Sequence, residues 1–521
     1  MLIGTKNFET GALVRYHVSM FIRKRKNPTG SISIQIINKV NGLNKVVCHI
    51  GTAKHNDPNK MKFLITQASK ALIKLENSTN LSLFDEISIK PRIHTIASRP
   101  TGFLEIFGKV FDDVALQKVV SDSIFKNLVI FRIAYPVSKL KTAQIMSSVY
   151  DLNVDKMVLY RFMDNLDENT RELLSQHCFQ YVQKFTKKTV DVIFFDCTTL
   201  HYEAFDEDDF RKMGYSKVGK FNQPQILVAL MVTTEGLPVG YEAFQGNTFE
   251  GHTLIPVLKR IRTKYKLKNI IFVADSGMLN EDNLIALQES NFEYIVGAKI
   301  KNESNHYKKL ILNKDNYTSD YATFTKGTDR LIVNYSVERA KKNKADRDRA
   351  ILRLKKRLVS KNKLTKSLVG NQGARKYLKL TGESTIHWNH EKIEEDAAWD
   401  GLKGVITNNT TLTATEAMSR YRSLWRVEKA FRMSKTDLKI RPIFHWKKSR
   451  IEAHLAITFT ALLVARLVEI KSNLSTEKIV EALKYVCTVK YEDLKTGEII
   501  ESRTDLPENA KIIYKSIGVP F

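Results

Sequence analysis

Two short apolar runs, each followed at once by an aspartate, place the strongest constraint on how this chain folds. Residues 190–195 precede Asp196, and residues 269–274 precede Asp275. Runs of β-branched and aromatic side chains of this length are typical of strands that are buried on both faces of a sheet. We therefore expect two central strands of an α/β core, each with an acidic side chain at its end.

The residues around these runs predict the rest of that core. Residues 225–232 and 237–244 read as strands on either side of a Thr-Glu-Gly turn, which is typical of a meander. A helix is expected from 253 to 265, and another begins near Asn280, before a strand at 292–300. The predicted order is three strands, a helix, a strand, a helix and a strand.

The first half of the chain predicts two further regions. Strands at 31–37 and 45–50, followed by a helical pattern at 60–75, indicate a small α+β module. The pattern from 102 to 188 is helical, and residues 139–166 fit two helices separated by a short break. Such a pair suits a helix-turn-helix that reads DNA, and it is equally common in a plain helical bundle.

Residues 301–412 are less regular, with strand-like pieces at 330–337, 376–380 and 401–407. Between the first two pieces lies a basic stretch, residues 341–366, in which lysine and arginine far outnumber acids. A run of this kind is usually a solvated helix face or a loop. Because Ile351, Leu354 and Leu358 fall on one side of a helix, a packed helix with a cationic outer face is the alternative. Its candidate phosphate contacts are Lys355, Lys356 and Arg357.

These patterns divide the chain into six expected regions. They are an N-terminal α+β module at 1–95, a helical region at 96–189 that is the candidate DNA-binding domain, the first part of the α/β core at 190–300, a β-rich insertion with the basic stretch at 301–412, the end of the core at 413–475, and a C-terminal tail at 476–521.

The charge of the chain points to its partner. Lysine and arginine number 83 against 56 aspartates and glutamates, a net charge of +27, which favours nucleic acid over a role in solubility alone. The four cysteines are widely spaced, so neither a zinc site nor a disulfide framework is expected, and a reducing cytoplasm fits best. Charged residues interrupt the apolar stretch at 451–470, which we interpret as a buried helix rather than a membrane span.

A helix near the C-terminus carries a third acidic candidate. Thr413 and Glu416 form a capping-box pattern that opens a helix expected to reach about residue 438. Spacings of seven residues place Tyr421, Glu428 and Lys435 on one face of it. An exposed ion-pair ladder would look similar, but the apolar residues between these positions indicate a helix that packs against the protein.

The segment from Tyr421 to Lys435 resembles the signature Y-x-x-R-x-x-x-E-x-x-x-x-x-x-K of bacterial insertion-sequence DDE transposases, which have a ribonuclease-H-like core. Position 424 departs from that signature, with Leu424 in place of arginine. Shorter strings resemble the same family in the same order. They are Phe-Phe-Asp196, Gly-Tyr-Ser-Lys217, Gln-Gly246-Asn247, Val-Ala-Asp275-Ser-Gly277 and Trp-Asp400-Gly401.

The resemblance implies a fold and a chemistry. The fold is an α/β ribonuclease-H-like catalytic core with a β-rich insertion, preceded by a small α+β module and a helical DNA-binding region. Asp196, Asp275 and Glu428 would be catalytic and would hold two Mg²⁺ ions, which Mn²⁺ could replace. Water would first cut one strand at the element's end, and the freed 3′ hydroxyl would then attack a second strand or the target. The implied DNA contacts on the signature helix are Tyr421, Arg426, Arg432 and Lys435.

Partners and alternatives follow from the same resemblance. The expected partners are the terminal inverted repeats, the target DNA and a second copy of the chain, in the bacterial cytoplasm on the nucleoid, with no membrane and no small-molecule substrate. Trp388, Trp399 and Trp425 are candidates to stack on a flipped base, although a core role is the more common one for each. A metal-dependent nuclease or resolvase and a non-catalytic DNA-binding derivative are the alternatives.

Overall fold

The computed structural model describes residues 19–40, 42–54, 57–79, 93–186, 192–203, 206–216, 219, 221–265, 270–278, 280–360, 369–381, 385–493 and 496–521. The chain forms two compact units. One unit comprises residues 1–97 and 490–501, and the other comprises residues 98–489 and 502–521.

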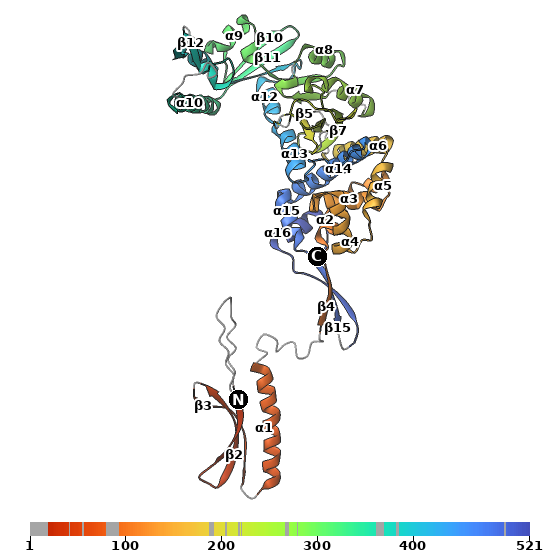
Figure 1. Cartoon of the computed structure of the whole chain (residues 1–521), viewed down its shortest axis with the longest axis vertical. Coiled ribbons are helices and arrows are strands. Elements are labelled where there is room, and N and C mark those ends of the chain that lie inside the picture. Colours follow the sequence, from red (N-terminus) through yellow and green to blue (C-terminus); the bar gives the residue numbers. More distant parts are fainter. Residues whose placement is uncertain are drawn as a thin grey trace. The chain divides into compact units, whose positions relative to one another are not determined.

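The N-terminal part of the first unit is a three-stranded antiparallel sheet with one helix. The strands are β1 (Ser19–Lys26), β2 (Ser31–Val40) and β3 (Leu43–Lys54), in that order across the sheet. Helix α1 (Pro58–Thr79) packs against all three strands and covers one face (Figure 1). This confirms the predicted strands and helix, whereas β1 was not predicted. The buried core consists of Ile34, Ala53, Leu64 and Ala68.

The second unit is built on an eight-stranded mixed sheet. Its centre holds the parallel strands β5 (Val192–His201), β8 (Ile271–Ala274) and β9 (Glu293–Ala298), and the antiparallel strands β6 (Gln225–Val232) and β7 (Pro238–Gln245) continue one side. The order along the chain, with helices before β8 and β9, is the predicted one. Central strands β5, β6 and β8 are buried almost throughout, as their apolar runs require.

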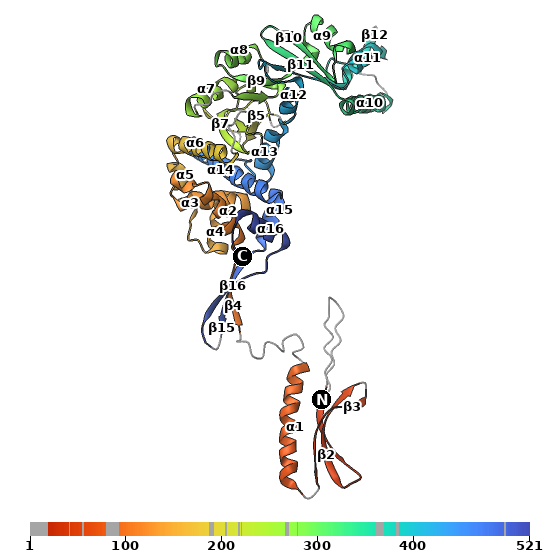
Figure 2. The same ribbon diagram turned by 180° about the vertical axis from the view of Figure 1, so that it is seen from behind.

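Helices lie on both sides of this sheet. Figures 1 and 2 show α7 (Leu254–Tyr265) and α8 (Glu281–Glu289) on one side and α12 (Ala414–Arg422) and α13 (Trp425–Thr436) on the other. Helix α12 packs on β8, β9 and β14 (Leu402–Thr407), and α13 packs on β5 and β6. Helices α12 and α13 therefore cover β5 and β8, the strands at which the predicted acids lie.

Three strands of the segment predicted as a β-rich insertion extend the central sheet. Strands β10 (Tyr321–Lys326), β11 (Asp329–Tyr335) and β14 (Leu402–Thr407) add to its edge, giving the order β10-β11-β14-β9-β8-β5-β6-β7. Strand β14 pairs with β9, more than one hundred residues earlier in the chain. A pairing between segments so far apart leaves no local pattern in the sequence.

The basic stretch forms a helix with one packed side, which was the alternative to a solvated face or loop. Helix α10 (Val337–Ser360) places Ile351, Leu354 and Leu358 in a small apolar cluster with Tyr377 and Leu378. Beside it lie the hairpin of β12 (Leu378–Thr381) and β13 (Thr385–Trp388) and the helix α11 (His390–Ala398). Positions 361, 363 and 366 of the stretch lie outside the described residues.

A helical region completes the second unit. It contains α2 (Gly102–Asp113), α3 (Ser123–Ala134), α4 (Lys139–Tyr150), α5 (Lys156–Asn165), α6 (Glu168–Thr186), α14 (Lys448–Ser472), α15 (Thr476–Lys484) and α16 (Glu508–Ile517). Helix α14 contacts α2, α3, α5, α16 and β7. It is long and apolar enough to cross a membrane, but 94% of its most apolar window is buried inside the protein, which confirms the buried helix.

The helices of the predicted tail are part of this helical region, whereas residues 490–501 belong to the first unit. Ile479 and Leu483 of α15 and Ile513 and Tyr514 of α16 belong to the same buried cluster as α2 and α14.

Short strands β16 (Ile499–Arg503), β15 (Cys487–Asp493) and β4 (Ile93–Pro100) form a further three-stranded sheet, and α9 (Asn305–Leu312) precedes β10.

Candidate active site

Asp196 and Asp275 lie side by side on neighbouring parallel strands. Phe195 of β5 is in register with Ala274 of β8. The residue that follows Phe195 is Asp196, and the residue that follows Ala274 is Asp275. Adjacent strands are about 4.8 Å apart. Asp196 is half-buried, and Asp275 is exposed.

Asp196 differs from its predicted place at a strand end, whereas Asp275 does not. Asp275 follows the last residue of β8, as predicted, but β5 continues beyond Asp196 to His201. The continuation is held by β6 alone, because β8 ends opposite Phe195. Asp196 therefore lies where the parallel pairing stops rather than where its strand stops.

The carboxylate of each aspartate accepts a hydrogen bond from the backbone amide of the next residue. The Oδ1 atom of Asp196 accepts a hydrogen bond from the Cys197 amide at 2.7 Å, and Oδ1 of Asp275 accepts one from the Ser276 amide at 2.7 Å. These bonds fix the side-chain direction of both carboxylates. The two acidic groups are therefore presented at one edge of the parallel strands.

Tyr421 is tied to the second aspartate. Its hydroxyl donates to Oδ1 of Asp275 at 3.3 Å, and the ring is buried. Burial raises the pKa of Tyr421, and the negative charges of Asp275 and Glu428 act in the same direction. The hydroxyl is accordingly a neutral donor whose partner in this structure is a carboxylate, and its predicted contact with DNA stays a prediction.

Gly297 makes this contact possible. A Cβ atom at Gly297, on the adjacent strand β9, would lie 2.2 Å from the Tyr421 hydroxyl oxygen and 3.0 Å from the Ser276 nitrogen. No side chain larger than hydrogen fits in that space without displacing the tyrosine or the turn after β8. Sequence reasoning did not single out this glycine.

Lys403 is a second residue that the sequence did not reveal. It lies on β14 with Nζ 4.4 Å from the centroid of the Tyr421 ring. Burial lowers the pKa of Lys403, Arg339 lowers it further, and Asp275 and Glu428 oppose both effects. Asp275, Glu428, Lys403 and Tyr421 thus share one electrostatic neighbourhood, with Arg339 and Arg422 at its margin.

Glu428 is exposed in the first turn of α13, and the helix that carries it is shorter than predicted. The capping box at Thr413 and Glu416 is confirmed, but helix α12 ends at Arg422 and a second helix, α13, begins at Trp425. Two backbone hydrogen bonds of the 3₁₀ type span the break between the helices. The Leu424 amide donates to the Tyr421 carbonyl, and the Val427 amide donates to the Leu424 carbonyl. Tyr421 and Glu428 therefore stand on two helices rather than on one continuous face.

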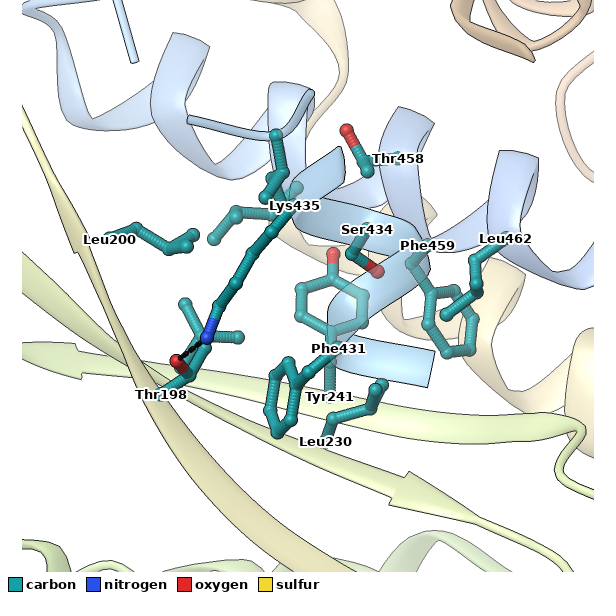
Figure 3. A pocket seen from close by; sticks show the side chains of 13 residues that line it. Thr198, Leu200, Leu230, Tyr241, Phe431, Ser434, Lys435, Thr458, Phe459 and Leu462 are labelled. Carbon is teal, nitrogen blue, oxygen red and sulfur yellow. Dashed lines mark hydrogen bonds between the residues drawn. The ribbon is translucent and has the colours of Figure 1, made fainter. Parts of the chain in front are cut away.

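Lys435 joins the C-terminal end of α13 to the central sheet. Its Nζ donates to the Thr198 hydroxyl of β5, two residues beyond Asp196 on the same face of the strand (Figure 3). The two side chains line a small cavity of about 30 Å³ together with Leu200, Phe431 and other mostly apolar residues. The lysine predicted to contact DNA thus links the Glu428 helix to the Asp196 strand.

A family model described as "Transposase DDE domain" matches residues 188–464, just over half of the chain. The chain belongs to this DDE transposase family. Its core is accordingly the ribonuclease-H-like fold of DDE transposases, with a mixed sheet and helices, and it is an enzyme of the DDE class, whose members use divalent metal ions.

Two solved structures are similar to this transposase. One is a piggyBac transposase synaptic complex with hairpin DNA, at 10% identity and a TM-score of 0.37, covering 74% of this chain and 79% of that one. The other is a Mos1 transposase paired-end complex with the left transposon end, at 12% identity and a TM-score of 0.15, covering 36% and 58%. No curated protein matches the sequence. The family assignment depends on the family model alone.

The acidic residues of this transposase fit a hard cation by their chemistry, since carboxylate oxygens are the donors that magnesium prefers. Asp196 and Asp275 are adjacent, and Glu428 lies on the helix above β5. Within the described ranges, no three acidic, histidine or cysteine side chains lie close enough together to enclose a single metal ion. Side-chain or helix movement is therefore needed before all three acids could share metal ions.

The other predicted DNA contacts are surface residues. Arg432, Lys355, Lys356 and Arg357 are exposed, and Arg426 is half-buried with its guanidinium 5.3 Å from the centroid of the Trp425 ring. Each has the exposure that a phosphate contact needs, and the DNA role of each remains a prediction.

The three tryptophans considered as stacking candidates and His454 occupy different environments. Trp399 is buried, which confirms a core role, whereas Trp425 is 52% exposed, so the core interpretation is wrong for that residue. Trp388 is half-buried beside Lys355 of α10. His454 is a buried histidine whose Nε2 bonds to the Ile440 carbonyl at 3.1 Å, so it belongs to the core.

Proposed function

We propose that this transposase cuts DNA at the ends of its own insertion sequence and joins the freed ends to target DNA. The observation that carries the proposal is the register of β5 and β8, which places Asp196 and Asp275 next to each other beneath the helix of Glu428. In the proposal these three acids hold two Mg²⁺ ions, for which Mn²⁺ can substitute. The ions would supply Lewis acidity to the scissile phosphate and lower the pKa of bound water.

The chain's own residues would orient the reaction. Tyr421 holds one carboxylate oxygen of Asp275 through its hydroxyl, which leaves the other oxygen to face the substrate. Lys403 brings a positive charge beside Asp275 and Glu428, where a phosphate would enter. Lys435 holds α13 on β5 through Thr198, and exposed Arg432 would contact the DNA backbone.

The finer features of the proposal come from the signature residues. Tyr421, Glu428 and Lys435 keep the spacing of the insertion-sequence signature, with Leu424 in place of its arginine. Two DNA ends must be held together for cutting and joining, so we propose a homodimer assembled on the terminal inverted repeats, working on the bacterial nucleoid.

The test uses a linear DNA that carries both ends of the element and a supercoiled target plasmid. We expect release of the element and its insertion into the plasmid with Mg²⁺ or Mn²⁺, and neither product with a chelator. Cutting without insertion would replace the proposal with a metal-dependent nuclease. Binding without cutting under all metals would replace it with a non-catalytic DNA-binding protein.

A further inference from the structure

The sheet of the N-terminal module carries a large uncompensated positive charge. Residues 19–54 contain seven lysines and arginines and no aspartate or glutamate. The seven cations are Arg23, Lys24, Arg25, Lys26, Lys39, Lys45 and Lys54. None of them takes part in an ion pair within the part of the chain that the structure describes. Six of them are exposed, and Arg23 is half-buried.

The two faces of this sheet differ in kind. One face packs Ile22, Ile34 and Ala53 against α1. Since side chains alternate between faces along a strand, the intervening residues point away from the helix. The outer face is therefore not covered by α1 (Figure 1).

Two cross-strand rows on the outer face consist entirely of polar side chains. The strand registers align Arg23 with Gln35 and His49, and Arg25 with Ser33 and Thr52. We call these six residues the outer polar rows. Of these six residues Ser33 is buried, and the other five present cationic, amide, imidazole and hydroxyl groups on adjacent strands about 4.8 Å apart.

Hydrogen bonds already order these rows. Arg23 Nη2 donates to Gln35 Oε1 at 2.9 Å, and the Ser33 and Thr52 hydroxyls lie 3.2 Å apart. The Nε of Arg23 is buried, whereas the side chains of Arg25 and Thr52 are exposed. Side chains that are ordered before binding lose less conformational entropy when an outside acceptor binds.

We propose that the outer polar rows of the N-terminal module bind duplex DNA, with the strands of the sheet in the major groove. This proposal rests on the proposed function, since it assigns part of that function's DNA recognition to a surface far along the chain from the acidic residues. The unpaired cations match a polyanion. Arginine and glutamine are the side chains that make paired hydrogen bonds to guanine and adenine edges, and the B-form major groove admits a strand pair.

Other nucleic acids fit this surface less well. Phe21, which precedes Arg23 by two residues on the same face of β1, is the one phenylalanine, tyrosine or tryptophan in residues 19–54. A single ring could stack on one base, whereas proteins that bind single strands stack successive bases on several aromatic side chains. The major groove of duplex RNA is too deep and narrow for side chains to read. A duplex DNA is therefore the occupant that both the charge and the shape favour.

The test compares two double variants of the full-length chain with the same loss of charge. Arg23→Gln with Arg25→Gln alters the outer face, and Lys62→Gln with Lys70→Gln alters exposed residues of α1 as the matched control. Binding of a labelled duplex carrying the element end is measured by fluorescence anisotropy over a salt series without divalent metal. We expect the outer-face variant to bind at least tenfold more weakly and the slope of log K against log salt to fall by about two, since each phosphate contact contributes about 0.9. The control should change binding less than threefold.

A third variant separates base reading from charge. Gln35→Ala with Thr52→Ala keeps every charge, so the salt slope should stay as in the unaltered protein while the preference for the element end over a scrambled duplex falls. A single strand and an RNA duplex of the same sequence serve as competitors and should compete at least tenfold less well than the DNA duplex.

Failure of this inference is distinguishable from failure of the proposed function. Equal effects of the outer-face and control variants, or equal competition by RNA, would overturn the DNA surface even if the protein cuts and joins its ends. A protein that binds the ends through Arg23 and Arg25 but never cuts would overturn the proposed function and leave the DNA surface standing.

Discussion

The Tyr421 hydroxyl donates a hydrogen bond to Oδ1 of Asp275 at 3.3 Å, which joins helix α12 to the residue that ends strand β8. Helix α13, which carries Glu428, follows α12 after a break of two residues, so this bond also influences the position of Glu428. The geometry of the acidic site thus depends on a side chain that carries no charge.

Replacing Tyr421 with phenylalanine should lower the rate of DNA cleavage about tenfold with little change in DNA binding. The substitution keeps the buried ring and removes the hydrogen bond to a charged group, and such bonds contribute about 1.5 kcal/mol or more. Single-turnover cleavage with saturating protein measures the effect. An unchanged cleavage rate would show that the bond does not orient Asp275 during the reaction.

Replacing Gly297 with alanine should damage the site more than the loss of the tyrosine hydroxyl does. The added Cβ would lie 2.2 Å from the hydroxyl oxygen, and overpacking of this kind costs about 1–3 kcal/mol. Combining Gly297→Ala with Tyr421→Phe should recover part of the lost cleavage, because the closest clash is removed. A double variant no more active than Gly297→Ala alone would place the damage elsewhere, for example at the Ser276 amide.

The contact between Lys435 and Thr198 predicts coupling between the two positions. Lys435→Met and Thr198→Val should each slow cleavage, and the double variant should be less impaired than the sum of the single effects, with a coupling energy of about 0.5–3 kcal/mol. The reason is that either change releases α13 from β5. If Lys435 acts only by contacting DNA phosphate, Thr198→Val would leave cleavage unchanged and the two effects would add.

The helical region should lose stability as the pH falls below about 6.5. Burial lowers the pKa of His445 to about 3, and the nearby charges of Lys139 and Arg132 lower it too. In the unfolded chain this histidine binds a proton near pH 6.5, whereas in the fold it stays neutral until about pH 3. The unfolded state therefore gains protons first, and between these pH values each such histidine costs about 1.4 kcal/mol of stability per pH unit.

His445→Gln should flatten that dependence. Denaturant unfolding at about pH 7 and about pH 5 measures it, and the variant should lose less stability between the two than the unaltered protein. His454, whose pKa burial also lowers, should retain its own share of the acid sensitivity. An identical loss of stability in both proteins would contradict the assignment of His445 as a buried neutral group.

The order of strands in the core could be predicted because each central strand is a local apolar run. Residues 192–195 and 271–274 lie between two helical layers, and burial on both faces demands such runs. The extent of β5 beyond Asp196 could not be predicted, since Cys197, Thr198 and Thr199 are mixed in character and are held by pairing with β6. The extension of the sheet by β10, β11 and β14 depends on contacts between distant segments in the same way.

The residues of the candidate site could be predicted only where a local pattern in the sequence indicates them. Glu428 stands out through its spacing from Tyr421 and Lys435, and the aspartates stand out through the strands before them. Gly297 and Lys403 come to the site from β9 and β14, and nothing next to them in the sequence indicates an acidic neighbour. The break at Ser423 and Leu424 was missed because both residues are compatible with a continuous helix.

The most direct test of the account is single-turnover cleavage and joining of the element's own ends by the intact protein, by Glu428→Gln, and by Glu477→Gln as an exposed control on α15. We predict that Glu428→Gln binds the ends normally but cuts at least a thousandfold more slowly, a change of about 4 kcal/mol in activation free energy, while Glu477→Gln matches the intact protein. If Glu428→Gln cuts and joins as fast as the intact protein, Glu428 is a surface residue of α13 and the three-carboxylate site is contradicted.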